Sequence, residues 1–171
     1  MPRIRIETQR LLLRNTMPGD IPALVSMWTD PEVTRFMGGP RDAAWLEGNF
    51  AEDAGKQDPL VYDQWPVVEK STDQVIGYCG LLDKEVEGRP EIELVYVFVP
   101  AAWGKGYASE IALALREHAT HSMGLKRLIA LIEPENRPSV RVAERVGFHA
   151  EKTVKRGDAE RVLYVYEEQP D

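Results

Sequence analysis

A strongly apolar strand followed by a glycine-rich loop and a helix constrains this sequence more than any other feature. The strand is residues 91–99, EIELVYVFV, and Gly104 and Gly106 stand in the loop before a helix that ends near Ser122. The first turn of a helix has unpaired N–H groups and the positive end of the helix dipole, so it is a natural anion site. Glycine lets a ligand approach the backbone closely. The pattern predicts a cradle for a pyrophosphate, with Lys105 adding positive charge.

The spacing of the glycines separates the ligand classes that use such a cradle. A P-loop needs G-x-x-x-x-G-K-[ST], which the sequence lacks. A dinucleotide fingerprint needs G-x-G-x-x-G/A, and here Ser109 stands at the third position after Gly104 and Gly106. That fingerprint also opens an early βαβ unit, whereas this loop follows segments patterned like an antiparallel meander. Dinucleotide binding is therefore disfavoured and stays open as a minor alternative.

The remaining segments predict a mixed α+β architecture with one central sheet. In chain order we expect a strand at 4–14, helices at 20–28 and 40–54, strands at 64–69, 74–82 and 91–99, the helix ending near 122, a strand at 125–132, a helix at 138–146 and strands at 148–156 and 161–167. Asp20 is expected to cap the first helix, and Pro31 to end it.

Composition limits the class of protein. The chain has 171 residues, which suits a single domain over 1–171. It carries 21 Lys and Arg against 28 Asp and Glu, a formal charge of −7, which disfavours a nucleic-acid partner because phosphate backbones need a cationic surface. No apolar run approaches the roughly 18 residues of a membrane helix, and we expect no membrane partner and no signal peptide. Cys79 stands alone, so we expect a cytoplasmic protein without disulfides and without a cysteine-rich metal site.

The glycine-rich loop resembles motif A of the GNAT N-acetyltransferase superfamily, [QR]-x-x-G-x-[GA]. Gly106 and Ala108 fill the last two positions, and Trp103 replaces the Gln or Arg. The form WGKGYASE is similar to the variant of the RimJ/RimL branch, and four further segments resemble that branch in the same order. They are TQRLLLR at 8–14, the stretch from Asp20 through DPEV at 30–33 to FMG at 36–38, VIGYCGL at 75–81, and a motif-B-like segment at 136–148. The resemblance covers nearly the whole chain.

The resemblance implies the GNAT fold, a central and mostly antiparallel mixed sheet of about six to seven strands flanked by about four helices. Two strands splay apart in this fold and form the cleft for acetyl-CoA, the implied co-substrate, and no metal is implied. The family pairs the strand before motif A with the pantetheine arm, which here falls on Val97, Phe98 and Val99. The main chain that is expected to hold the pyrophosphate belongs to Gly104, Lys105, Gly106, Tyr107 and Ala108.

Two polar residues of the motif-B-like segment are implied contacts to the thiol end of coenzyme A. They are Asn136 and Ser139. Without the family, Asn136 reads as a turn residue and Ser139 as a cap or first-turn residue of the following helix. Both interpretations stay open at the level of sequence.

Glu93 is the candidate general base for the implied reaction, in which an amine attacks a thioester. It matches a family E-x-G-Y glutamate, with Val95 in place of the glycine. Alternation puts it on one strand face with Glu91, Val95, Val97 and Val99. An ion pair is the alternative role. Many members carry a tyrosine acid where this chain has Ala143, so Ser139 is the replacement candidate, beside protonation by solvent.

The acceptor is open between a protein or peptide N-terminus and a small-molecule amine, since one fold serves many acceptors. Aromatic residues of the first two helices, where the family builds its acceptor wall, belong to the core by default or shape the pocket. They are Trp28, Phe36, Trp45 and Phe50. A CoA-binding sensor without turnover is the alternative function, motivated by Ala143. The resemblance to the family is also compatible with a homodimer.

Overall fold

The structure is a computed structural model that describes residues 3–56 and 61–169. Within these residues eight strands form one sheet in the order β1-β2-β3-β4-β5-β6-β8-β7. The strands are β1 (Ile4–Glu7), β2 (Leu11–Arg14), β3 (Gln64–Glu69), β4 (Gln74–Val86), β5 (Arg89–Phe98), β6 (Arg127–Ile132), β7 (His149–Arg156) and β8 (Ala159–Glu167). Neighbouring strands are antiparallel except β5 and β6. The mostly antiparallel mixed sheet is confirmed.

Four α-helices and three shorter helical segments connect the strands. They are η1 (Pro18–Asp20), α1 (Ile21–Thr29), α2 (Ala43–Gly55), η2 (Pro100–Ala102), α3 (Tyr107–Glu117), η3 (His118–Ser122) and α4 (Arg137–Arg145). The segment η3 continues α3 with π-helical geometry, which the sequence pattern does not reveal. In the described ranges no helix has the length and apolar character needed to cross a membrane.

The N-terminal segment differs from the expected single strand at 4–14. It folds back between β1 and β2, where the Thr8 main-chain N–H donates to the Leu11 carbonyl at 2.9 Å. This hairpin gives the sheet eight strands instead of six to seven. The expectation fails because two apolar strands joined by three residues have the same composition as one long strand.

The expected capping role of Asp20 is wrong. The helix α1 begins after it, but the side chain of Asp20 makes no capping hydrogen bond. Its carboxylate instead binds the guanidinium of Arg14, at 2.6 and 2.9 Å, and accepts from the main-chain N–H of Met17 at 2.7 Å. An Arg14–Asp20 ion pair therefore attaches the end of β2 to the start of α1. In α2 the cap is Asp42, which accepts from the main-chain N–H of Trp45 at 2.8 Å.

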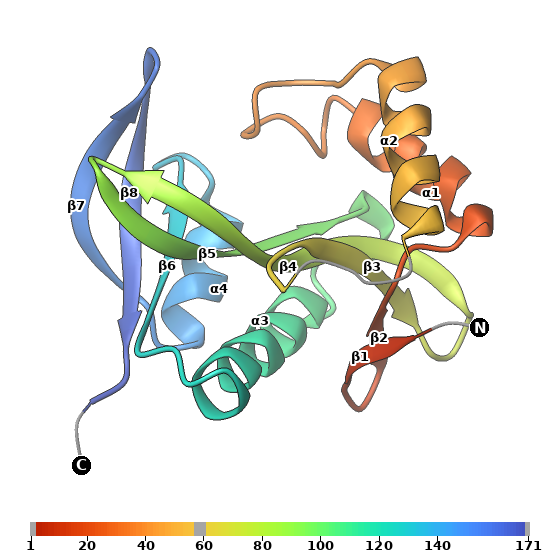
Figure 1. Cartoon of the computed structure of the whole chain (residues 1–171). Coiled ribbons are helices and arrows are strands. Elements are labelled where there is room, and N and C mark those ends of the chain that lie inside the picture. The colour runs from red at the N-terminus through yellow and green to blue at the C-terminus, as the bar shows by residue number, and fades with distance from the viewer. Residues whose placement is uncertain (1–2, 57–60, 170–171) are drawn as a thin grey trace.

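The sheet is covered on both faces (Figure 1). The main core lies between the sheet and the pair α3 and α4, and Leu94 and Phe98 of β5 belong to it. A second core, with Val97 of β5 and Tyr78 of β4, packs under α1 and α2 on the other face. Successive residues of β5 therefore face opposite layers, as alternation predicts for a buried strand.

Two glycines of β4 are dictated by close approach. A Cβ on Gly77 would lie 2.8 Å from the ring of Phe98, and a Cβ on Gly80 would lie 2.0 Å from the Asp63 carbonyl oxygen. Real Cβ atoms do not approach that closely, so a side chain at either position would push β5 or the start of β3 away. These contacts give a physical reason for the I-G-x-x-G-L pattern.

Candidate active site

The glycine-rich loop enters α3 through Gly106, which is the N-cap of the helix. Its φ of 81° and the φ of 73° at Gly104 lie in the left-handed region that favours glycine. Because a glycine N-cap has no side chain to occupy the N–H groups of the first turn, these groups stay available to an anion. The helix has 11 residues, long enough for a substantial dipole at this end.

The N-terminal hairpin braces this loop. The guanidinium of Arg10 donates from Nη1 to the Lys105 carbonyl at 2.8 Å and from Nε to Glu110 at 2.7 Å. It also lies over the ring of Tyr107, 4.4 Å from the centroid. Glu110 further accepts from the Thr8 hydroxyl at 2.7 Å and from the Arg10 main-chain N–H at 2.9 Å. Sequence reasoning missed this brace, although its members stand in the TQRLLLR and GYASE segments.

The side chain of Tyr107 turns away from the loop. It is buried, and its hydroxyl donates to the carboxylate of Glu69 at the end of β3. This hydrogen bond is the largest influence that lowers the pKa of Glu69. Only the main chain of Tyr107 is therefore placed for an anion, whereas its side chain anchors α3 to the sheet.

The strands β5 and β6 separate soon after they meet. They are parallel, and their ladder consists of the single pair Glu93 and Ile129. On its other edge β5 pairs with β4 along its whole length, from Arg89 to Phe98. The part of β5 after Glu93 therefore has one paired edge and one open edge, which is the splayed geometry that a bound chain can enter.

Main-chain direction differs among the three residues expected to pair with pantetheine. The Val99 N–H donates to the Ile76 carbonyl at 3.0 Å, so it points to the β4 side and is not free to bind a ligand at the open edge. Val97, two residues earlier, has the same orientation. Phe98 points to the open edge, where its carbonyl accepts from the indole N–H of Trp103 at 2.8 Å. Trp103, at the motif position of Gln or Arg, thus covers the end of the open edge.

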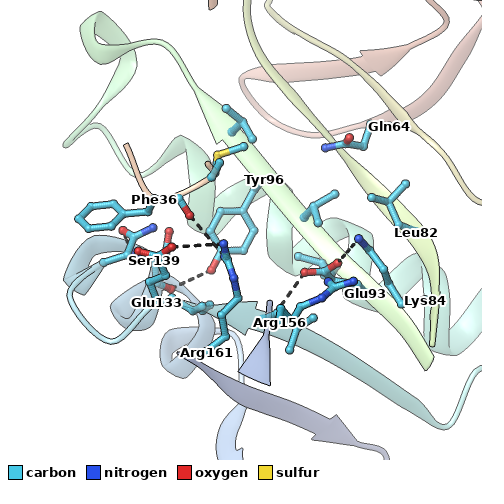
Figure 2. Close-up of a pocket in the computed structure, with 18 of the residues that line it drawn as sticks. Phe36, Gln64, Leu82, Lys84, Glu93, Tyr96, Glu133, Ser139, Arg156 and Arg161 are labelled. Atoms are coloured by element: carbon cyan, nitrogen blue, oxygen red, sulfur yellow. Dashed lines mark hydrogen bonds and ion pairs between the residues drawn. The ribbon is translucent and has the colours of Figure 1, made fainter. Parts of the chain in front are cut away.

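A cavity of about 450 Å³ lies at this open edge. Both faces of β5 contribute to its wall, through Glu93, Val95 and Val97 on one face and Leu94 and Tyr96 on the other, so it extends between the splayed strands. Figure 2 shows the side chains of β4, β5, β8 and α4 that converge on it. The volume is in the range of small-molecule sites.

Glu93 lies in this cavity, as its strand position predicts. Its side chain is almost fully buried, and its carboxylate has two neighbours. Lys84 Nζ of β4 is 3.4 Å from one oxygen, and the Leu131 main-chain N–H donates to the other at 3.4 Å. The site therefore offers a carboxylate that faces the cavity and is also half of an ion pair.

Asn136 and Ser139 line the same cavity from the start of α4. The Asn136 side chain accepts from the Ser139 main-chain N–H at 3.4 Å, so Asn136 caps the helix as well as facing the cavity. The Tyr96 hydroxyl donates to the Ser139 carbonyl at 2.8 Å. Burial raises the pKa of this phenol, so it keeps its proton. Tyr96 was not expected from the sequence, because a tyrosine within an apolar strand is usually a packing residue.

Several charged residues of the cavity were also missed. Arg161 of β8 donates to Glu133 at 3.2 Å and to the Phe36 carbonyl at 3.3 Å, which joins the C-terminal hairpin to the segment before α2. Lys84, Arg156 and Arg41 add three more cations to the cavity wall. No local motif connects Lys84, Arg156 and Arg161, and the sheet order β4-β5-β6-β8-β7 brings their strands together.

The aromatic residues of the first helices divide between core and cavity. Trp28 and Phe36 line the cavity, whereas Phe50 is buried in the core and the Trp45 side chain is exposed. Cys79 is fully buried, as expected of a small apolar residue. No group of three or more His, Cys, Asp or Glu side chains in the described ranges is arranged to hold a metal ion.

Comparison with known proteins identifies the family to which this geometry belongs. A family model described as an acetyltransferase (GNAT) domain matches residues 10–149. The chain belongs to the GNAT acetyltransferase family. It is 33% identical over 154 residues to the uncharacterized N-acetyltransferase p20 of Bacillus licheniformis, and the aligned region spans 84% of this chain and 82% of that protein. The protein is therefore an acyltransferase.

Solved structures share the fold over nearly the whole chain. A GNAT-family acetyltransferase from Bacillus anthracis has a TM-score of 0.78 at 26% identity and covers 98% of both chains. Two further structures are 17% identical to this chain, and at that level the likeness concerns the fold alone. RimL, a ribosomal L7/L12 alpha-N-protein acetyltransferase, has a TM-score of 0.78 over 98% of this chain and 95% of its own. The aminoglycoside acetyltransferase AAC(6′)-Ib in complex with coenzyme A has a TM-score of 0.74 over 92% and 94%.

Proposed function

We propose that residues 1–171 form a single domain that transfers an acetyl group from acetyl-CoA to a primary amine. The observation that carries the proposal is the cavity at the open edge of β5, which holds a buried carboxylate, Glu93, on the same strand that leads into the glycine-rich loop. Acetyl-CoA supplies an activated acyl group as a thioester. The named GNAT relatives include one solved with coenzyme A, which supports this co-substrate.

The glycine-rich loop and the open strand edge are the proposed coenzyme A site. The main chain of Gly104 to Ala108 binds the pyrophosphate at the helix start. The main chain of Phe98, with its neighbours Val97 and Val99, lies along the pantetheine arm. Asn136 and Ser139 contact the thiol end, because both line the cavity from α4.

Glu93 is the proposed general base. A lysine amine has a pKa of about 10.4 and an α-amine about 7.7–8.0, and only the neutral amine attacks. The amine nitrogen forms the amide bond while the carbon–sulfur bond breaks. Glu93 accepts the amine proton, directly or through one water. Lys84 holds the carboxylate in place, since its ammonium lies 3.4 Å away.

The leaving thiolate then needs a proton. Ala143, at the family's tyrosine position, is buried and carries no acidic group. The hydroxyls of Ser139 and Tyr96 are the candidates in the cavity wall. We propose that one of these two groups, or solvent, protonates the sulfur.

The acceptor is a protein N-terminus or a small-molecule amine. The opening TQRLLLR and the WGKGYASE form support a place in the RimJ/RimL branch. RimL acetylates a ribosomal protein and AAC(6′)-Ib an aminoglycoside, so structural neighbours include both kinds of acceptor. A CoA-binding sensor without turnover is the second candidate, and the missing tyrosine at Ala143 is the observation that favours it.

Glu93→Gln separates the enzyme from the sensor. Acetyl-CoA turnover is followed as released thiol with a panel of amines, and coenzyme A affinity by calorimetry. Loss of a general base lowers kcat by about 10²–10⁴-fold, and we expect unchanged coenzyme A affinity. Glu85→Gln, an exposed carboxylate of β4, is the matched control and should behave as wild type. Turnover by neither wild type nor variant, together with tight coenzyme A binding, would support the sensor and refute the enzyme.

Ser139→Ala and Tyr96→Phe decide between the two acids. Each change removes one hydroxyl and keeps the packing, so the acid is the residue whose loss lowers kcat and shifts the alkaline limb of the pH–rate profile. If both variants retain kcat and profile, protonation comes from solvent.

A further inference from the structure

The charges around the cavity do not match the charge of the chain. Among the residues that the structure describes, six charged side chains line it, four basic and two acidic. They are Arg41, Lys84, Arg156, Arg161, Glu93 and Glu133. The cavity therefore carries an excess of two positive charges, in a protein whose formal net charge is −7. A concave site with low-dielectric walls focuses such a local field, so this local excess governs which ligand enters.

Three of the four cations already have partners. Lys84 lies 3.4 Å from Glu93, and Arg161 lies 3.2 Å from Glu133. These two pairs leave no acidic side chain of the cavity wall without a cation. Arg41 donates to the carbonyls of Gly39 and Met37 at 2.6 and 2.7 Å, which fixes its guanidinium without neutralising its charge.

Arg156 is the fourth cation. It ends β7, beside the turn to β8, and extends into the same cavity as Glu93 (Figure 2). No hydrogen bond or ion pair joins its guanidinium to any other residue in the described ranges. Arginine presents a planar fork of donors that matches a carboxylate or a phosphate, so Arg156 is positioned to receive such a group.

The phosphates of coenzyme A do not account for this excess. The expected place of the pyrophosphate is the loop at 104–108, and no residue of that loop lines the cavity. The 3′-phosphate belongs to the adenosine, which is separated from the thioester by the pyrophosphate. The thioester end of coenzyme A is uncharged. Positive charge beside Glu93 is therefore directed at the acceptor.

We propose that the acceptor is an amine that carries a carboxylate or phosphate on the same molecule, with Arg156 binding the anionic group and Glu93 facing the amine. This inference rests on the proposed acetyltransferase function and narrows its acceptor. A polycationic amine meets an uncompensated positive charge in the cavity and is disfavoured. Both a small amino acid and an acidic peptide N-terminus present this chemistry.

A matched pair of amines tests the charge preference directly. Both 4-aminobutyrate and 1,4-diaminobutane carry a primary amine on a four-carbon chain, whose far end is a carboxylate in the first and an aminomethyl group, charged as an ammonium, in the second. We expect kcat/KM to favour 4-aminobutyrate by at least tenfold. Equal rates, or a preference for the diamine, would overturn the inference while leaving the acetyltransferase established. The tripeptide amides Ser-Glu-Ala and Ser-Lys-Ala form a second arm. Their rates, compared with those of the two small amines, distinguish a peptide acceptor from a small-molecule acceptor.

Binding of the acetylated products keeps the inference testable if no amine is turned over. Such a result would refute the proposed function, because no acceptor of either charge would react. The affinities of N-acetyl-4-aminobutyrate and N-acetyl-1,4-diaminobutane for the coenzyme A-loaded protein would still report the cavity charge. Tighter binding of the anionic product is expected, and equal binding contradicts the inference.

Arg156→Gln assigns the preference to one residue. Loss of a charge-assisted hydrogen bond corresponds to about a tenfold to hundredfold fall in kcat/KM for 4-aminobutyrate. The rate with 1,4-diaminobutane should stay the same or rise. Lys155→Gln removes an exposed cation from the preceding position of β7, which does not line the cavity, and is the control. Equal losses in the two variants, or equal losses with the two amines, would show that Arg156 does not bind the acceptor.

Discussion

Replacing Glu110 by alanine removes the carboxylate that connects the N-terminal hairpin to the glycine-rich loop. It accepts from the Thr8 hydroxyl at 2.7 Å and from Arg10 twice, at 2.9 Å through the main chain and 2.7 Å through Nε. The Arg10 side chain is 41% exposed, which limits the ion pair to about 1 kcal/mol or less. The other two bonds reach a charged and partly buried acceptor, and each contributes about 1–2 kcal/mol. We expect the free energy of unfolding to fall by about 2–5 kcal/mol.

Thermal unfolding and coenzyme A titration together test this brace. For a chain of this length the loss corresponds to a fall in Tm of about 4–20 °C. Arg10 also holds the Lys105 carbonyl, at 2.8 Å, so the freed loop must be ordered again by the ligand. Ordering costs of about 0.5–1.5 kcal/mol for each immobilised side chain correspond to a two- to tenfold weaker coenzyme A affinity.

The control is Glu117→Ala, on the same helix, where the glutamate side chain is 53% exposed and makes a long contact with Arg116 at 3.9 Å. Alanine favours the helix at both positions, so propensity does not separate the two variants. If Glu110→Ala and Glu117→Ala have the same Tm and the same affinity, the brace contributes nothing and the reasoning is refuted. A lower Tm with unchanged affinity would restrict the brace to folding.

Two further predictions concern acid and thiol chemistry. Burial raises the pKa of Glu110, but hydrogen bonds from Thr8 and Arg10 outweigh it, and the pKa lies below its usual 4.5. A lowered folded pKa gives stability that is present above about pH 4.5 and is lost as the pH falls through the folded value. Urea unfolding at pH 5 and pH 3 should therefore show a larger loss in wild type than in Glu110→Ala, and equal losses would contradict this. Burial raises the pKa of the Cys79 thiol, so a disulfide reagent should react only after unfolding, and labelling of the native protein would show an accessible thiol.

Much of the fold is readable from the sequence because its signals are local. The apolar run at 91–99, the helix from Gly106 and the closing hairpin all appear near their expected places. Where local signals are ambiguous, the predicted boundaries and caps of strands and helices are wrong. The segment at 4–14 divides into two strands, and Asp20 binds Arg14 instead of capping α1, because a tertiary ion pair competes with the cap.

The candidate site also divides into residues that a local sequence pattern indicates and residues that only the fold brings together. The loop at 104–108 and Glu93 lie on consecutive segments with a recognisable pattern, so the sequence indicates both positions. The partners of these groups come from distant segments, such as Arg10 for the loop and Lys84 for Glu93. Their residue types are common on any protein surface, and only the folded sheet gives them a role.

The charge of the cavity differs in sign from the net charge of the whole chain. A net charge of −7 is compatible with a cationic acceptor when the chain is treated as one body. The cavity carries the opposite sign of charge, because four cations and two carboxylates face it and the two carboxylates are already paired. A substrate responds to the field at the reacting groups, which falls off over about 8 Å at physiological ionic strength, and not to a sum over the chain. For the proposed acceptor, the strand order that places Arg156 beside the cavity therefore matters more than the composition of the chain.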